Sequence, residues 1–115
     1  MTPEERKALD VFVAALRKHY GKQLHDIVLY GSRARGDDSP DSDVDLAVIL
    51  NDGDWRPFSE LMVMAGMSYD ALMRTGLFIQ SIPIPLSSWE SPAKQSNRTF
   101  LEAARCDARK LSAAA

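Results

Sequence analysis

The chain has 115 residues, a formal net charge of −2 at pH 7, and 45% hydrophobic and 26% charged residues. This size predicts one domain with one core, spanning residues 1–115. The slightly acidic charge argues against direct binding to nucleic acid, which requires a basic surface. Cys106 is the single cysteine, so an internal disulfide is excluded. Because no apolar run is long enough for a signal peptide or a membrane span, we expect a cytoplasmic protein.

The N-terminal segment has the signals of an amphipathic helix. Thr2, Pro3 and Glu5 have the spacing of a capping box with proline at the first helical position. Gly21 is expected to end this helix. Apolar residues between these ends recur at helical spacing and predict one buried stripe. Its members are Leu9, Phe12, Val13, Leu16 and Tyr20.

A glycine-serine turn follows the first apolar strand, which is expected over residues 24–30. Gly31 allows a ligand to approach the backbone closely. A helix that begins at Ser32 would present unpaired amides to an anion, and the Ser32 hydroxyl adds a further polar group. Arg33 and Arg35 place positive charge near the same turn. The segment therefore has the parts of a phosphate-binding turn.

The second strand, expected from Asp43 to about Leu50, begins with two carboxylates. Asp43 and Asp45 share one face of the strand, roughly 6.5–7 Å apart at the backbone. Carboxylates at this spacing can converge on Mg²⁺, which proteins hold through carboxylates and substrate phosphates. The sequence therefore predicts a site for a nucleoside triphosphate and Mg²⁺. Three acids of the intervening turn are interpreted as solvated loop residues: Asp37, Asp38 and Asp41.

A second helix is expected from about Pro57 to Arg74. Its predicted core stripe consists of Phe58, Leu61, Met62, Ala65, Tyr69 and Leu72. Further apolar residues lie outside that stripe: Val63, Met64, Met67 and Ala71. This pattern indicates either a helix buried on two sides or a methionine-rich surface that binds a partner through Met64 and Met67.

The C-terminal third is predicted to contain a strand, a polar connection and a last helix. The strand, residues 77–86, carries Pro83 and Pro85, which cannot donate to a ladder, so this end of the strand is expected at a sheet edge or beyond the sheet. Residues 87–90 are interpreted as a turn, in which Trp89 packs over the core or, as the less favoured alternative, contacts a nucleotide base. Apolar residues of the last helix are Phe100, Leu101, Ala104, Ala108 and Leu111, and Cys106 is interpreted as a small helical residue. The order helix, strand, strand, helix, strand, helix predicts an α/β (α+β) fold with a small mixed sheet flanked by helices.

The run Gly31-Ser32-Arg33-Ala34-Arg35-Gly36, followed by Ser42-Asp43-Val44-Asp45-Leu46, resembles the signature of the DNA polymerase beta-like nucleotidyltransferase superfamily. The small size resembles its minimal nucleotidyltransferases, which are often paired with a HEPN-domain protein in toxin–antitoxin modules. The resemblance implies ATP with Mg²⁺ and transfer of a nucleoside monophosphate to an acceptor. In the minimal proteins that acceptor can be a tyrosine of the HEPN toxin, which is thereby silenced. Catalysis and metal binding would then fall to Asp43 and Asp45, and nucleotide binding to Gly31, Ser32, Arg33, Arg35 and Ser42.

One part of the superfamily pattern is missing from the third strand. A third carboxylate usually lies there, but Gln80 or Ser81 occupies its expected place in this chain. Neither side chain can act as a base or bind Mg²⁺ strongly. Glu90, just beyond the strand, is an alternative source of the acid.

Two functions therefore stay open. The first is an antitoxin that transfers AMP from ATP to a hydroxyl of a partner. The second is a nucleotide-binding module that silences or scaffolds a partner by contact alone. The acceptor would come from a partner subunit, from another copy in a homo-oligomer, or from a small molecule.

Overall fold

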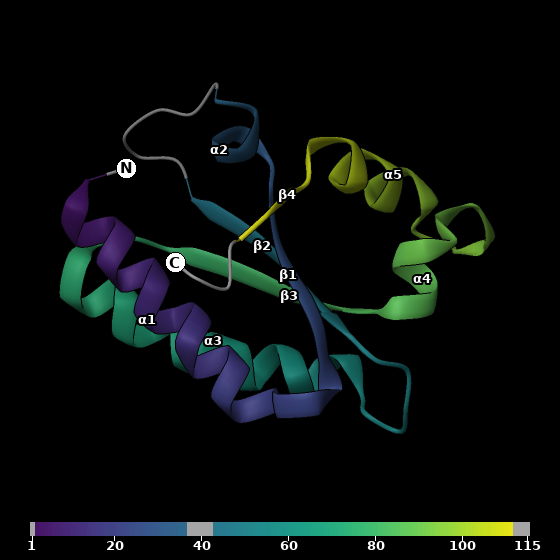
Figure 1. Cartoon of the computed structure of the whole chain (residues 1–115), viewed down its shortest axis with the longest axis horizontal. Helices are drawn as coiled ribbons and strands as arrows, with labels where there is room; N and C mark the ends of the chain where they lie inside the picture. The colour runs from purple at the N-terminus through teal and green to yellow at the C-terminus, as the bar shows by residue number, and fades with distance from the viewer. Residues whose placement is uncertain (1, 37–42, 112–115) are drawn as a thin grey trace.

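A four-stranded mixed sheet, in the order β3-β2-β1-β4, lies at the centre of the molecule (Figure 1). The computed structural model describes residues 2–36 and 43–111. β1 (Leu24–Tyr30) pairs antiparallel with β2 (Val44–Leu50) and with β4 (Arg109–Lys110). β2 pairs parallel with β3 (Ile79–Pro85), which is an edge strand. The predicted mixed sheet and the edge position of the proline-containing strand are therefore confirmed.

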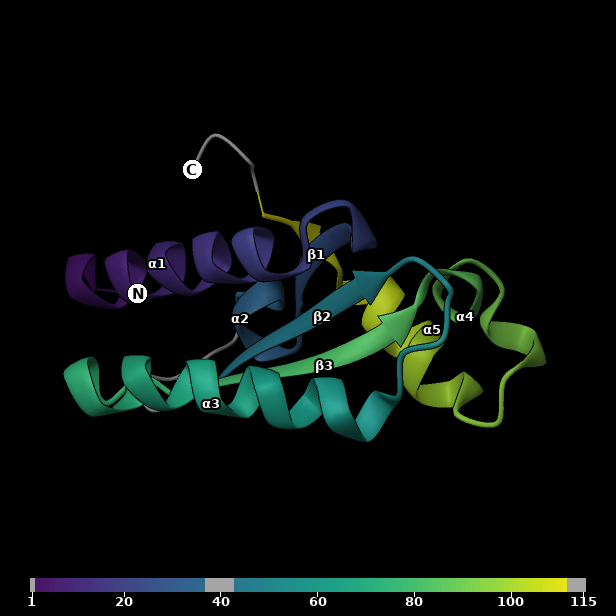
Figure 2. The ribbon, with the colours of Figure 1, turned by 90° about the horizontal axis from the view of Figure 1, so that it is seen from below.

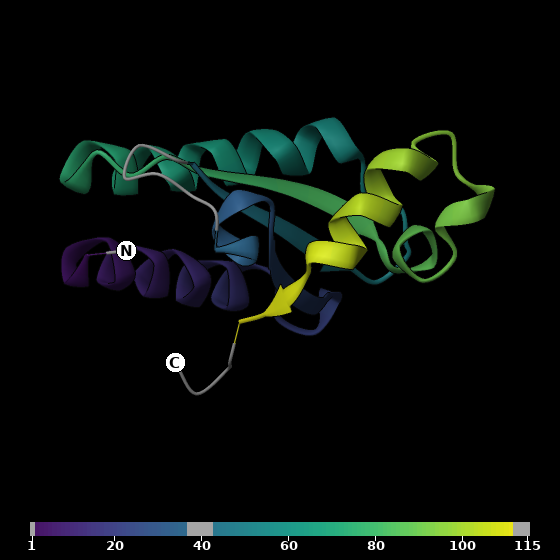
Figure 3. The same ribbon diagram turned by 90° about the horizontal axis from the view of Figure 1, so that it is seen from above.

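Helices cover both faces of this sheet. The long helices α1 (Pro3–Tyr20) and α3 (Pro57–Thr75) lie side by side on one face, as Figure 2 shows. α4 (Leu86–Glu90) and α5 (Arg98–Asp107) pack against the other face, and the one-turn α2 (Ser32–Arg35) follows β1 directly (Figure 3). Two short 3-10 helices, Gly21–Gln23 and Pro92–Lys94, connect these elements. Within the described residues, none of the helices combines the length and the apolar character needed to cross a bilayer.

The alternation of side chains along β2 divides the apolar interior into two clusters. Val44, Leu46 and Val48 point to the α1–α3 side. Ala47 and Ile49 point to the α4–α5 side, where they meet Leu101 of α5. Because successive strand residues face opposite sides, Asp45 lies on the α4–α5 side of the sheet. The larger cluster therefore lies on the face of the sheet opposite Asp45.

α1 forms as its sequence predicts. The Thr2 amide donates to Glu5 Oε1 at 2.8 Å, and the Glu5 amide donates to Thr2 Oγ1 at 3.1 Å, so both bonds of the capping box are present. The predicted stripe is buried at Leu9, Phe12, Leu16 and Tyr20, and Val13 packs partly buried against it. Capping and periodicity are local signals, which explains why this element could be read from the sequence alone.

The core stripe predicted for α3 is wrong. The helix buries Met64, Ser68 and Ala71, whereas the six residues of the predicted stripe are exposed. Small side chains at 68 and 71 let the helix pack closely, and the Ser68 hydroxyl donates to the Ala65 carbonyl at 3.0 Å, so its burial leaves no unsatisfied donor. The predicted partner surface through Met64 and Met67 is also wrong, because Met64 is fully buried and Met67 packs against the core.

Two C-terminal expectations also need correction. Residues 86–90 form the helix α4 rather than a turn, although Trp89 packs on the core as predicted. The last helix ends at Asp107, because Ala108 adopts extended backbone (φ −58°, ψ 132°). The following residues pair with β1 as β4, and Leu111 packs against the α1–α3 cluster. The otherwise unpaired edge of β1 thereby gains a partner.

A hydrogen bond between α1 and α3 gives a testable stability effect. The Tyr20 hydroxyl donates to Glu60 Oε1 at 2.9 Å, and burial, with a further contribution from this bond, raises the pKa of Tyr20. We expect Tyr20→Phe to lower the free energy of unfolding by about 1–2 kcal/mol, measured by urea denaturation at pH 7. Since the folded-state pKa exceeds the unfolded value, the wild type should lose stability above about pH 10, and the phenylalanine variant should lose less, because only Tyr30 among these two tyrosines still contributes. Equal free energies of unfolding for both proteins at pH 7 would contradict the assignment.

Candidate functional site

The site begins at Gly31, where β1 ends and α2 begins. Gly31 has φ +79°, a conformation that side chains with a Cβ rarely adopt. A Cβ at this position would lie 2.6 Å from Asp45 Oδ2 of the neighbouring strand. The amides of Ala34 and Arg35 both donate to the Gly31 carbonyl at 3.1 Å, which fixes the one-turn helix after the strand. Glycine is therefore required here both for the backbone conformation and for the close approach of Asp45.

Two carboxylates meet beside this glycine. Asp45 is half-buried in β2, and Asp43 is exposed immediately before the strand. Burial raises the pKa of the Asp45 carboxyl, and the nearby charge of Asp43 raises it further. Two negative charges crowded at a partly buried position are stabilised by a cation, so the electrostatics of the pair suit a metal ion.

The sheet register brings two more side chains to the same place. Tyr30 of β1 and Gln80 of β3 are the direct neighbours of Asp45 on either side. The Tyr30 ring packs edge-to-face on Phe100 of α5, with 5.7 Å between ring centroids. Burial, with a contribution from the Asp45 charge, raises the pKa of Tyr30 to about 12. Its hydroxyl is therefore neutral at pH 7 and can donate a hydrogen bond.

Tyr30 had no predicted role. The sequence feature that could have indicated a role for Tyr30 is its position as the last residue of the strand, directly before Gly31. The partner strand that places it beside Asp45 could only be known from the register.

Gln80, and not Ser81, lies where a third carboxylate was expected. Gln80 is exposed on the Asp45 face, whereas Ser81 is buried on the α1–α3 side. Glu90 is the last residue of α4, which follows the C-terminal end of β3. Gln80 lies near the other end of β3, and the five residues from Gln80 to Pro85 span about 16 Å. Glu90 therefore does not supply the missing acid. Within residues 2–36 and 43–111 no group of three His, Cys, Asp or Glu side chains gathers for a metal ion.

The two arginines of the turn extend toward different helices. The Arg33 side chain is only 4% exposed, and its Nη2 lies 3.9 Å from Glu5 Oε2 of α1. The hydrogen bond from the Thr2 amide lowers the pKa of Glu5, and the Arg33 charge lowers it further. Arg35 Nη1 lies 2.8 Å from Asp107 Oδ2 at the end of α5. Both arginines thus connect the turn to the helices around it.

Four predicted residues lie outside the part of the chain that the structure describes. They are Ser42, a candidate for nucleotide binding, and Asp37, Asp38 and Asp41, interpreted as solvated loop acids.

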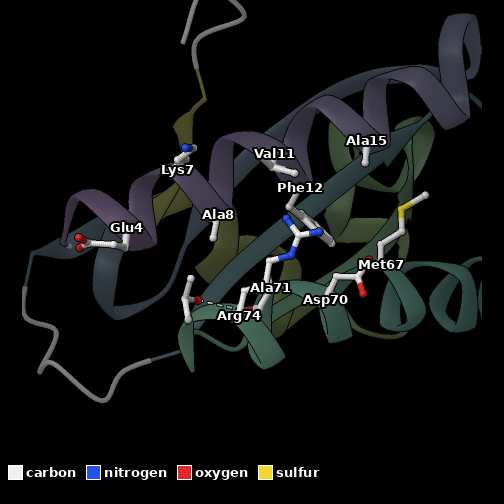
Figure 4. Close-up of a pocket in the computed structure, with 11 residues that line it drawn as sticks. Glu4, Lys7, Ala8, Val11, Phe12, Ala15, Met67, Asp70, Ala71 and Arg74 are labelled. Atoms are coloured by element: carbon white, nitrogen blue, oxygen red, sulfur yellow. Dashed lines mark hydrogen bonds between the residues drawn. The ribbon is translucent and has the colours of Figure 1, made fainter.

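A groove between α1 and α3 is separate from this arrangement. It has a volume of about 380 Å³ and is lined by apolar side chains that include Val11, Phe12 and Met67, with Asp70 and Arg74 at its rim (Figure 4). The sheet lies between this groove and Asp45, so the groove is not part of the candidate site.

The close contact at Gly31 predicts a strong effect of a single methyl group. Gly31→Ala should destabilise the fold by about 1–2 kcal/mol because of the positive φ, and should displace the Asp45 carboxyl. Gly36 also has a positive φ (+81°), but a Cβ there meets no atom of the described residues within 4 Å. Gly36→Ala is therefore the control for a positive φ with an intact Asp45, and its backbone cost should be the smaller one, because Gly36 is in the left-handed helical region (ψ 11°) whereas Gly31 has ψ −159°, which is almost restricted to glycine. Thermal denaturation measures the first effect and titration with Mg-ATP the second. Equal Mg-ATP affinity in both variants would exclude a role for the contact between Gly31 and Asp45.

A glycine-ended strand, a one-turn helix and a carboxylate pair at the start of the antiparallel neighbour define a nucleotidyltransferase type of fold and site. Residues 9–91 match the family described as the nucleotidyltransferase domain. The chain belongs to this family, within the DNA polymerase beta-like superfamily, as the signature around Gly31 and Asp43 predicted.

Comparison with known proteins adds one relative by sequence and two solved structures that resemble the fold. A protein of Methanocaldococcus jannaschii, named "Putative protein adenylyltransferase", is 42% identical over 45 residues, which is 39% of this chain and 45% of that protein. The chain thus spans about half the length of this curated relative. A solved structure described as a toxin-antitoxin with AMP-PNP aligns over 90% of this chain and 72% of its own, with a TM-score of 0.58 and 17% identity. A cyclic dinucleotide synthase of Elizabethkingia meningoseptica, solved with GTP and Apcpp, aligns over 70% of this chain and 36% of its own, with a TM-score of 0.48 and 19% identity.

Proposed function

We propose that this protein transfers AMP from ATP to a hydroxyl group of a protein partner, and that the partner is a HEPN-domain toxin that the transfer silences. The observation that supports this most is the packing of Asp45 against the backbone of Gly31, which joins the phosphate-binding turn to the carboxylate pair. The name of the archaeal relative and the description of the toxin-antitoxin structure agree with the proposal.

Different residues of the site would bind different parts of the substrate. The backbone of Gly31 and Ser32, with the Ser32 hydroxyl, would hold the triphosphate. Arg33 and Arg35 would add positive charge around it, and Ser42 would complete the nucleotide contacts. Asp43 and Asp45 would hold Mg²⁺, since carboxylate oxygens are its preferred ligands and the crowding of their charges favours a cation. When bound, Mg²⁺ supplies neutralisation of the phosphate charge.

The reaction is a displacement at the α-phosphorus of ATP. The acceptor oxygen forms a bond to that phosphorus, the bond to the β-phosphate breaks, pyrophosphate leaves, and the acceptor proton passes to water. Positioning and electrostatic stabilisation account for most of the rate in this chemistry. The neutral Tyr30 hydroxyl, beside Asp45, can donate a hydrogen bond to a phosphate or acceptor oxygen at this point.

Gln80 favours a second candidate function. The position opposite Asp45 carries an amide, which cannot accept a proton from the acceptor. A chain with glutamine at this position can bind the nucleotide to stabilise its own fold and can neutralise its partner by contact alone.

Incubation with the genomic neighbour separates these two functions. Purified protein, the neighbouring gene product, ATP and Mg²⁺ should give a neighbour that is heavier by one AMP group in intact-mass spectrometry, and the chelator EDTA should prevent this. A neighbour that is neutralised without any added mass would reject the transfer and support the binding module. A neighbour that is neither modified nor neutralised would reject both.

A further inference from the structure

One stripe of α3 that is turned away from the sheet, beside the exposed Ser59 and Asp70, is apolar along the length of the helix. We call this the outer face, defined by Phe58, Met62, Ala65, Gly66, Tyr69 and Met73. Its four large side chains are 72%, 55%, 59% and 66% exposed in that order. At 100° per residue Met62, Gly66 and Met73 lie opposite the buried residues of the helix, Phe58, Ala65 and Tyr69 lie to one side of these three, and none of the six carries a charge. A helix with two apolar sides is unusual for a surface element, which normally has one polar face.

The spacing along the outer face is that of a helix–helix contact. The outer-face residues Phe58, Met62, Ala65 and Tyr69, and then Leu72 beside this face, follow one another at intervals of four, three, four and three residues. This is the alternation of the apolar seam in coiled coils, where two helices meet along a shared stripe. The stripe is therefore patterned for another helix.

Gly66 points to the same conclusion. It lies in the middle of α3, where glycine is less favourable than other residues, and its φ is not positive. A Cβ at this position would meet no atom of residues 2–36 and 43–111 within 4 Å, so no contact within this part of the chain requires a glycine. Small residues at the centre of a helix surface allow a second helix to approach closely.

The order of residues on this face is suited to a second copy of itself. In an antiparallel pair centred between Ala65 and Gly66, equal distances from the centre place Phe58 opposite Met73 of the second copy. The same symmetry places Met62 opposite Tyr69. Each aromatic ring thus meets a methionine, and contacts between thioether sulfur and aromatic rings are favourable. At the centre, Ala65 of each copy lies opposite Gly66 of the other copy.

The exposed area is close to what a dimer needs. The outer face, with Leu61 and Leu72 beside it, exposes on the order of 650 Å² of large apolar side chains, taking roughly 200 Å² for each fully exposed one. A standard interface buries about 800 Å² on each partner, and an ordinary apolar patch of a monomer has about 300–600 Å².

We propose that the outer face of α3 is the interface of a symmetric homodimer, in which two α3 helices pack antiparallel across a two-fold axis at Ala65 and Gly66. The candidate site lies on the opposite side of the sheet, so both copies keep Asp45 accessible. The proposal concerns the purified chain without nucleotide or partner and does not depend on the proposed function.

Sedimentation velocity over a concentration series is the first test. The wild type should dimerise, and Met62→Lys with Tyr69→Lys should raise the dissociation constant at least about a hundredfold, because four charges would be buried at each dimer contact. Val11→Lys with Val63→Lys is the matched control, since it also replaces two exposed apolar residues by lysine, outside the outer face. This control should dimerise like the wild type. A wild type that remains monomeric at about 1 mM, or a control that loses the dimer equally, would overturn the proposal.

Cysteine cross-linking tests the antiparallel geometry without relying on lysine variants that fail to fold. In a Cys106→Ser background, Gly66→Cys should form a disulfide with its own second copy, because it lies at the axis. Phe58→Cys alone should not, because the two positions would be about 22 Å apart along the helices, whereas a disulfide needs Cα atoms within about 7 Å. A mixture of Phe58→Cys and Met73→Cys should form the mixed disulfide. Self-linkage of Phe58→Cys, or no linkage of Gly66→Cys, would reject the arrangement.

Discussion

Replacing Asp43 and Asp45 together by asparagine should abolish AMP transfer while the fold remains intact. Asparagine keeps the shape of the side chain and removes the charge that would hold Mg²⁺. Metal ions contribute several kcal/mol to stabilisation of the transition state, so we expect a loss of at least about a thousandfold in rate. Transfer of label from ATP to the partner measures the rate, and calorimetry should show a matching loss of Mg-ATP affinity.

The stability of this double variant makes the experiment interpretable. Burial and the charge of Asp43 raise the pKa of Asp45, so the charged carboxylate is less favourable in the folded than in the unfolded chain. A raised folded-state pKa means that stability falls as the pH rises above the unfolded value of 3.8. At pH 7 the asparagine variant should therefore be at least as stable as the wild type. Asp54→Asn with Asp70→Asn, at two exposed positions away from the site, is the matched control and should keep full activity.

The same variant distinguishes chemistry from contact in cells. If transfer silences the toxin, the double variant should fail to protect cells that express the partner, although it still folds. Full protection by the variant would reject the catalytic proposal and would leave the contact-based module as the explanation.

Features of the fold that depend on neighbouring residues in the chain could be predicted from the sequence. The capping box at Thr2, the helical period of α1, the turn at Gly31 and the prolines of β3 are all local signals. The mixed sheet followed from the order of the elements, because strands that follow one another closely pair antiparallel. The family signature added the predicted roles of Gly31 and of the Asp43–Asp45 pair, which stay predictions.

Features that depend on tertiary packing could not be predicted in this way. α3 is apolar on two sides, and periodicity alone does not tell which side faces the sheet; the small Ser68 and Ala71 mark the buried side only once the packing is known. The two residues of β4 lack any strand pattern and are extended because β1 has a free edge. The choice between Gln80 and Ser81 required the register of β3 against β2, since a shift by one residue exchanges the two faces.

That register leads to the second large effect. Gln80→Glu should raise the rate of AMP transfer by about 10- to 100-fold, since a positioned general base contributes typically 10²–10⁴-fold. Gln80 is the direct neighbour of Asp45 on the adjacent strand, at the usual strand separation of about 4.8 Å, and glutamate has almost the same shape. The introduced carboxylate would stand beside the pair as a third metal ligand and as an acceptor for the proton of the attacking hydroxyl.

The neutral variant Gln80→Ala makes this result specific. It removes the amide without adding a charge, so it should leave the rate within a few-fold of the wild type. The gain from glutamate should grow with pH as the new carboxyl loses its proton, and the pH–rate profile of transfer measures this. An unchanged rate for Gln80→Glu would show that the site does not lack a third acid. A rate reduced equally by both substitutions would show that the amide of Gln80 itself takes part, because only the amide is absent from both variants.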